Sequence, residues 1–99
     1  MAGQVALAVD GSLVGRGDMQ AQARQVFTNL KNVLEEAGGS LAHIVKMTTI
    51  LTHSDNIETY RAVRNEFFKD PFPPNTLLII DSLASKDFLI EVEAIAVLD

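Results

Sequence analysis

The segment from Ile90 to Val97 is apolar except for two glutamates, Glu91 and Glu93, which stand two residues apart. Side chains of a β-strand alternate between the two faces of a sheet, so both carboxylates share one face with Ile95. Burying an unpaired carboxylate is costly. The two glutamates are therefore either solvent-exposed positions or groups held for a purpose, and the question is what would pair with them.

Two helices are predicted upstream of this strand. Apolar residues recur at steps of three and four, which predicts a helix over residues 19–37. Asp18 is its expected N-cap, and Gly38-Gly39 should end it because glycine readily takes the left-handed conformation. A second apolar stripe follows an expected cap at Ser54-Asp55. Proline stops this second helix at Asp70-Pro71, since it lacks the amide hydrogen.

Short runs of aliphatic and β-branched residues predict four strands, over residues 4–9, 44–52, 76–80 and 89–98. The order β-α-β-α-β-β predicts an α+β fold with a mixed four-stranded sheet and two helices on one face. Strands joined by helices are expected to be parallel, and the last two strands to form an antiparallel hairpin. Since both sheet faces carry apolar residues, a partner subunit is expected to cover the second face.

The chain has 99 residues, a net charge of −5 and no cysteine. The length predicts one domain over residues 1–99. The basic residues are scattered, without the stripe that neutralises phosphates, so nucleic acid is not expected as a partner. Apolar runs are too short to span a bilayer and the start shows no signal-peptide pattern, so a cytoplasmic protein with no membrane contact is expected.

Several polar residues allow a plain interpretation. His43 and His53 flank a predicted strand, but metal sites usually need three or four ligands, so no metal site is expected. Asp55 reads as a helix cap. Asn75 follows Pro73-Pro74, which fix the entry of the chain into a strand. Asn75 is either part of a loop-to-strand transition, which the residues alone favour, or a polar group aimed at a ligand near Glu91.

A set of segments, taken together and in order, then points to a known family. These segments are Gly3-Gln4-Val5-Ala6-Leu7, Gln22 to Leu30, Val45 to Thr52, Phe72-Pro73-Pro74, and Glu91 to Val97. The chain resembles the RidA/YjgF family of reactive intermediate deaminases, also called L-PSP endoribonuclease-like. The resemblance implies a homotrimer with a chorismate-mutase-like fold and ligand sites in clefts between subunits. It also implies hydrolysis of enamines or imines to 2-keto acids and ammonia, without a cofactor.

The resemblance also suggests site residues. Glu91 stands where the family has the glutamate that positions water, and Gly3 and Asp55 stand where residues line the cleft. Active members carry an arginine that grips the substrate carboxylate, whereas this chain has Asn75 there. Asparagine is neutral and cannot supply a charged, bidentate contact. The chain therefore resembles the arginine-lacking branches, and it also lacks the hairpin that precedes the Gly-Gln segment in the family.

Two functions stay open at this point. The first is a small-molecule hydrolase or deaminase of a non-standard imine, in which Glu91 acts as general base. The second is a non-catalytic, oligomeric module that binds a small metabolite in the same cleft. Ribonuclease action rests only on the older family name, and the acidic chain disfavours it.

Overall fold

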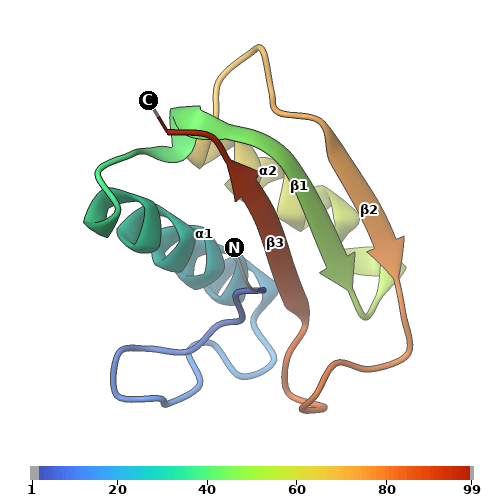
Figure 1. The fold of residues 1–99 in the computed structure, drawn as a ribbon. Coiled ribbons are helices and arrows are strands. Elements are labelled where there is room, and N and C mark those ends of the chain that lie inside the picture. Colours follow the sequence, from blue (N-terminus) through green and yellow to red (C-terminus); the bar gives the residue numbers. More distant parts are fainter. Residues whose placement is uncertain (1–2, 99) are drawn as a thin grey trace.

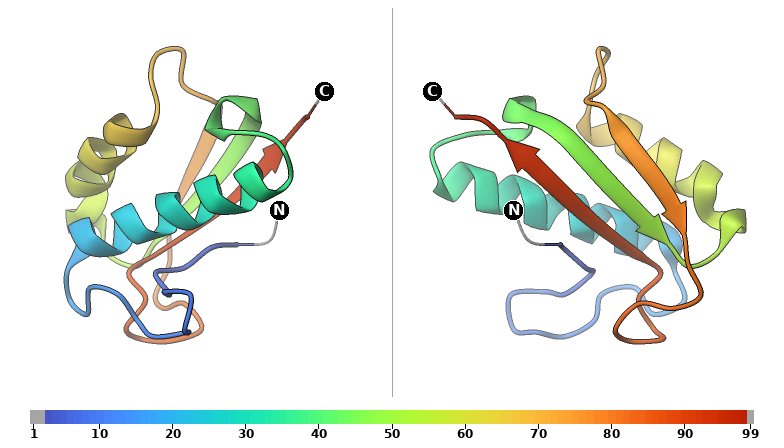
Figure 2. Two further views of the ribbon diagram at one scale, coloured as in Figure 1. Left: turned by 90° about the vertical axis from the view of Figure 1, so that its left-hand side faces the viewer. Right: turned by 45° about the vertical axis from the view of Figure 1, so that its right-hand side comes forward.

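The computed structural model describes residues 3–98 of the chain. Two helices pack on one side of a three-stranded sheet, and the other side is uncovered by this subunit (Figures 1 and 2). Within these residues no helix is long and apolar enough to cross a membrane. The elements, in chain order, are α1 (Met19–Glu36), the 3-10 turn η1 (Leu41–His43), β1 (Ile44–Leu51), the 3-10 turn η2 (Ser54–Asn56), α2 (Ile57–Phe67), β2 (Asn75–Ile79) and β3 (Ile90–Ala96).

The sheet has the order β2-β1-β3, with β1 parallel to β2 and antiparallel to β3. The predicted hairpin of the last two strands is therefore wrong, because β1 lies between them. The ten residues that separate β2 from β3 are too many for a tight turn. They let β3 cross the end of β1 and pair with its free edge, which leaves β1 hydrogen-bonded on both sides.

The predicted first strand is reduced to isolated bridges, Gln4 with Val92 and Leu7 with Leu13. The expectation of a four-stranded sheet thus fails among residues 3–98. A side chain explains the difference: Asn29 Nδ2 of α1 donates hydrogen bonds to the carbonyl oxygens of Val5 and Leu7, both at 3.0 Å. These carbonyls are satisfied by α1, so the segment needs no continuous strand partner.

Helix α1 forms as predicted, within one residue. Asp18 Oδ1 accepts a hydrogen bond from the Ala21 backbone N–H at 3.1 Å, which caps the first turn. At the other end Gly38 has φ +88°, and the Gly39 N–H donates to the Leu34 carbonyl at 2.8 Å. Helix α2 differs: Ser54 and Asp55 belong to η2, and the helix starts later, with no side-chain cap hydrogen bond from its N-cap residue.

The core lies between the helices and the sheet. Phe27 of α1 is its centre, with ring centroids 6.2 Å from Tyr60, 5.4 Å from Phe67 and 5.6 Å from Phe68. Aromatic pairs at this spacing join α1 to the whole length of α2. The sheet contributes Met47, Leu51, Ile90, Val92 and Ala94 to the same buried cluster.

The opposite sheet face, which we call the open face, carries apolar side chains that this subunit leaves exposed. Leu78 of β2 is 46% exposed and Ile95 of β3 is 55% exposed. In a regular strand, Val45 would point the same way as Met47. A register shift between Ile44 and Lys46 reverses this: Ile44 is buried, and Val45 is 48% exposed.

Candidate functional site

Gly3 and Glu91, two of the residues predicted for the site, lie against each other. A Cβ atom built on Gly3 would stand 2.8 Å from both Cδ and Oε2 of Glu91. Backbone hydrogen bonds fix this approach, since the Gln4 N–H donates to the Val92 carbonyl at 2.8 Å and the Val92 N–H donates back at 3.0 Å. A residue with a Cβ atom here would displace the carboxylate from its present position.

Glu91 lies on the open face, beside Ile50 of β1 in the antiparallel register. Its side chain is half-buried. Within residues 3–98 its carboxylate makes no hydrogen bond or ion pair, so all its lone pairs are available to a ligand or to water. A carboxylate in this condition can take a proton from a bound molecule, which is the requirement for a general base.

Gln22 of α1 supports the segment that leads into β3, and the sequence interpretation missed it. The side chain is fully buried. Its Nε2 donates to the carbonyls of Gly15 at 3.1 Å and Asp87 at 2.8 Å, and its Oε1 accepts from the Leu89 N–H at 2.8 Å. The sequence offers one sign of this role: Gln22 lies four residues before Val26, so its polar side chain falls on the apolar stripe of the helix.

Asn75 is not brought to Glu91. It pairs in register with Met47, whose side chain faces the helices, whereas Glu91 pairs with Ile50 on the open face. Asn75 Nδ2 donates to Tyr60 Oη at 2.8 Å, and Asn75 Oδ1 accepts from Thr49 Oγ1 at 3.0 Å. Thr49 Oγ1 and Tyr60 Oη are 3.0 Å apart, so the three side chains close a ring of hydrogen bonds.

Asp55 lies in η2, between β1 and α2, and is exposed. No hydrogen bond or ion pair links its side chain to Gly3, Glu91 or Asn75 in the part of the chain that the structure describes. Its place in the site therefore remains a prediction.

The histidines have local partners. His43 Nδ1 accepts from the Ser40 N–H at 3.0 Å in a capping box, and His53 Nδ1 lies 2.9 Å from Thr52 Oγ1. Over residues 3–98, no three histidine, aspartate or glutamate side chains come together in a group that could hold a metal ion.

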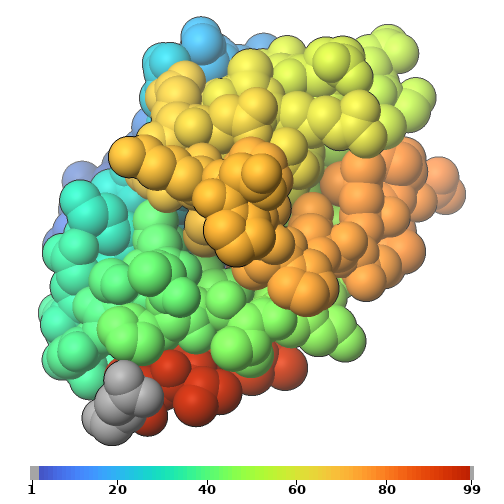
Figure 3. All heavy atoms as spheres, turned by 90° about the horizontal axis from the view of Figure 1, so that it is seen from above, coloured from blue at the N-terminus to red at the C-terminus, as the bar shows by residue number. Residues whose placement is uncertain are grey.

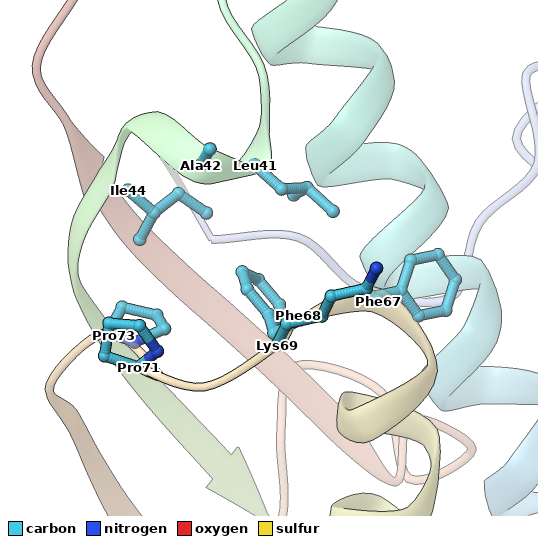
Figure 4. Close-up of a pocket in the computed structure, with 8 residues that line it drawn as sticks. All are labelled: Leu41, Ala42, Ile44, Phe67, Phe68, Lys69, Pro71 and Pro73. Atoms are coloured by element: carbon cyan, nitrogen blue, oxygen red, sulfur yellow. The ribbon is translucent and has the colours of Figure 1, made fainter.

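A separate pocket of about 480 Å³ lies at the other end of β1 (Figures 3 and 4). Figure 3 looks onto this end, where the loop before β2 overhangs the start of β1. The lining is apolar apart from Lys69, whose side chain extends toward the Phe67 ring in Figure 4. None of the residues predicted for the site lines it, and neither does a carboxylate or histidine. Its lining residues are Leu41, Ala42, Ile44, Phe67, Phe68, Lys69, Pro71 and Pro73.

The hollows nearest to Glu91 are shallow. One of about 400 Å³ is lined partly by Gly3, Gln4 and Asn29, and one of about 180 Å³ lies on the open face beside Lys46 and Glu93. Neither is lined by Glu91 itself. Within residues 3–98, one subunit thus presents the Glu91 carboxylate without enclosing it.

The arginines are used elsewhere in the fold. Arg24 of α1 makes two 2.9 Å hydrogen bonds to Glu66 of α2. These hydrogen bonds are the main reason that the pKa of the Glu66 carboxyl lies below its ordinary value. Desolvation opposes them, and the Coulombic attraction of Arg24 adds a smaller lowering. This pair joins the exposed edges of the two helices.

Comparison with known proteins identifies the family. The family model described as endoribonuclease L-PSP matches residues 1–98. A RutC family protein of Pyrococcus abyssi is 35% identical over 96 residues, covering 97% of this chain and 75% of that protein. A 2-iminobutanoate/2-iminopropanoate deaminase of Dermatophagoides farinae is 28% identical over 99 residues, covering 100% of this chain and 77% of that protein.

A solved structure of a RidA protein has the same fold as this chain. RidA from an Antarctic Psychrobacter superposes with a TM-score of 0.91 at 30% identity, covering 99% of this chain and 78% of that chain. The α+β arrangement of two helices on a mixed sheet is thus shared across the match. The chain belongs to the endoribonuclease L-PSP family, which is the RidA/YjgF family that its sequence resembles.

Proposed function

We propose that this protein hydrolyses reactive imines or enamines and releases ammonia, with Glu91 as general base. The observation that carries the proposal is the Glu91 carboxylate, which lies against Gly3 and has no hydrogen bond or ion pair among residues 3–98. The deaminase activity named for the Dermatophagoides farinae relative supports the reaction class.

The chemistry follows from the position of the carboxylate. Glu91 accepts a proton from a water molecule as the water oxygen attacks the imine carbon. With the imine nitrogen protonated, this addition gives a neutral carbinolamine, and Glu91 passes the proton that it took to the nitrogen. The C–N bond then breaks as the C=O bond forms, and Glu91 takes the hydroxyl proton, which leaves with the ammonia as ammonium. The products are a carbonyl compound and ammonia. No electrons are exchanged with a cofactor.

The site is completed by a second copy of the chain, in a homotrimer. Apolar residues on the open face, among them Leu78 and Ile95, are exposed in one subunit. Exposed apolar area of this kind marks an interface. Glu91 lies on that face without an enclosing wall, so assembly would bury it and strengthen its electrostatic effect. Sedimentation analysis is expected to give a trimer at micromolar concentration; a stable monomer there would count against this part of the proposal.

The direct test is Glu91→Gln, which keeps the shape of the side chain and removes the base. Loss of a general base is expected to lower the rate of imine hydrolysis by about 10²- to 10⁴-fold. Glu36→Gln is the control, because it removes an exposed carboxylate at the end of α1, away from the open face. Equal rates for wild type and Glu91→Gln, with folding shown intact by circular dichroism, would refute the assignment.

The alternative is a non-catalytic module that binds a metabolite in the same place. It is favoured by the hydrogen-bonded ring of Asn75, Tyr60 and Thr49, which leaves the amide turned away from Glu91. A thermal-shift screen separates the two, because a ligand that binds the native state raises the melting temperature. Ligand-dependent stabilisation without turnover of any imine supports the module; turnover that depends on Glu91 supports the enzyme.

A further inference from the structure

The charges around Glu91 indicate which substrate the site takes. Glu93 lies on the same face of β3, about 7 Å along the strand from Glu91. The only basic residue in the three strands is Lys46. It lies four positions along β1 from Ile50, the partner of Glu91, which corresponds to about 13 Å. Lys46 lies closer to Glu93, with which it lines one hollow, but one lysine does not balance two carboxylates, so the net charge of this part of the sheet is negative.

The arginines do not neutralise the negative charge around Glu91, because each guanidinium already has a partner within the subunit. Arg16 bonds to Asp87 at 2.7 Å, and Arg24 to Glu66 at 2.9 Å. Arg61 bonds to Glu58 at 3.1 Å. Arg64 bonds to Asn65 at 3.0 Å and lies 4.5 Å from the centroid of the Phe72 ring. A second copy has the same sequence, so each guanidinium that it contributes would come with the same carboxylate, amide or aromatic partner.

Asn75 does not take the place of an arginine as a group that binds a substrate carboxylate. Its amide donates to Tyr60 and accepts from Thr49 on the core face of the sheet. Both partners are fully buried, so a turn of the amide toward a ligand would leave buried hydroxyls with fewer hydrogen bonds.

We propose, building on the imine hydrolysis of the preceding proposal, that the substrate carries no carboxylate and binds as an iminium cation, as the aldimine of a primary amine does. A protonated C=N group is attracted by Glu91 and Glu93, whereas a carboxylate on the adjacent carbon is repelled by both. The reaction is R–CH=NH₂⁺ plus H₂O giving R–CHO plus NH₄⁺. A C–O bond forms, the C–N bond breaks, and both water protons end on nitrogen, so atoms and charge balance.

Two substrates that differ by one carboxylate test this. Benzaldimine is generated from benzylamine by a flavin amine oxidase, and 2-imino-2-phenylacetate from phenylglycine by an amino acid oxidase. Semicarbazide traps the free imine, so protein-catalysed hydrolysis appears as a loss of semicarbazone. We expect kcat/KM to favour benzaldimine by about 100-fold at low salt. The preference should shrink toward about 1 M salt, because the charges responsible are partly exposed.

The outcomes are distinct. Equal or faster hydrolysis of 2-imino-2-phenylacetate overturns the substrate assignment while imine hydrolysis stands. No acceleration of either substrate overturns both. A preference for benzaldimine that does not respond to salt rules out its electrostatic origin. Lys46→Met checks for a distant cation: an unchanged preference is expected, and a preference that rises sharply would show that Lys46 binds the carboxylate, against this proposal.

Discussion

Gly3 and Glu91 come from opposite parts of the chain, yet a single added methyl group on Gly3 would stand 2.8 Å from the Glu91 carboxylate. The contact gives a physical reason why a residue without a side chain could matter to the site that we propose around Glu91. It also makes the position of the carboxylate sensitive to small changes at residue 3.

Gly3→Ala is expected to lower imine hydrolysis by about 10- to 100-fold, because misplacing a reacting group by about 1 Å has costs of this size. The melting temperature should change little, since the atoms that must move are the end of a flexible side chain. Steady-state kinetics and calorimetry measure the two effects. Val9→Ala, a fully exposed change in the same segment, is the control. Normal kinetics in Gly3→Ala would show that the contact does not position Glu91.

Gln22→Leu is expected to destabilise the fold by about 3 kcal/mol, since three buried hydrogen bonds lose their partner. Urea unfolding gives this value. Gln20→Leu, an exposed change on the same helix, should stay within about 0.5 kcal/mol of wild type. Similar effects for the two variants would mean that the glutamine amide does not hold the segment before β3.

Asn75→Ala is expected to cost about 1–3 kcal/mol, because it leaves the Tyr60 and Thr49 hydroxyls short of partners in the core. Tyr60→Phe breaks the same ring from the other side. If the ring acts as a unit, the double variant is less destabilised than the sum of the two single variants. Additivity within about 0.5 kcal/mol, measured by urea unfolding, would show three independent contacts instead.

The Arg24–Glu66 pair predicts one component of the pH dependence of stability. The pKa of Glu66 is lower in the folded state, chiefly through the hydrogen bonds from Arg24, than the ordinary 4.5. The pair therefore stabilises the fold above that pH, and this contribution disappears as the pH falls through the lowered pKa. Both side chains are exposed, so the effect is small.

Glu66→Gln should accordingly be less stable than wild type at neutral pH, with the difference shrinking as the pH falls below 4.5 and through the lowered pKa of Glu66. Chemical unfolding at a series of pH values measures it. Glu36→Gln removes an exposed carboxylate that has no ion pair among residues 3–98 and serves as control. A Glu66→Gln difference that grows toward acid pH would contradict the expected direction of the effect.

The sequence predicted the elements better than their pairing. Periodicity placed α1 and β1 within one residue of their bounds, because each pattern is contained in the segment itself. Pairing depends on distant partners. The Asn29 side chain bonds to backbone carbonyls of residues 4–9, where a strand was predicted, and β1 lies between β2 and β3. Neither contact can be seen in a local sequence pattern.

For the candidate site too, local patterns were predicted from the sequence and long-range contacts were not. Alternation along β3 placed Glu91 and Glu93 on one face, and the structure shows both away from the core. The approach of Gly3 came from resemblance to a family, since nothing in the residues around it points to Glu91. The partners of Gln22 lie in two loops, so its buried position in α1 could be expected but its role could not.

Within residues 3–98, the segment that carries Gly3 forms isolated bridges and no continuous strand, and hydrogen bonds attach it to β3 and α1 at separate points. Two join Gln4 to Val92, and two run from the Asn29 amide to the carbonyls of Val5 and Leu7. Segments held in this way open at a lower free energy than the core does. Such opening would withdraw Gly3 from Glu91 while both helices and the sheet stay folded. Heat should therefore inactivate the protein before it melts, and backbone amide exchange should be fastest in this segment.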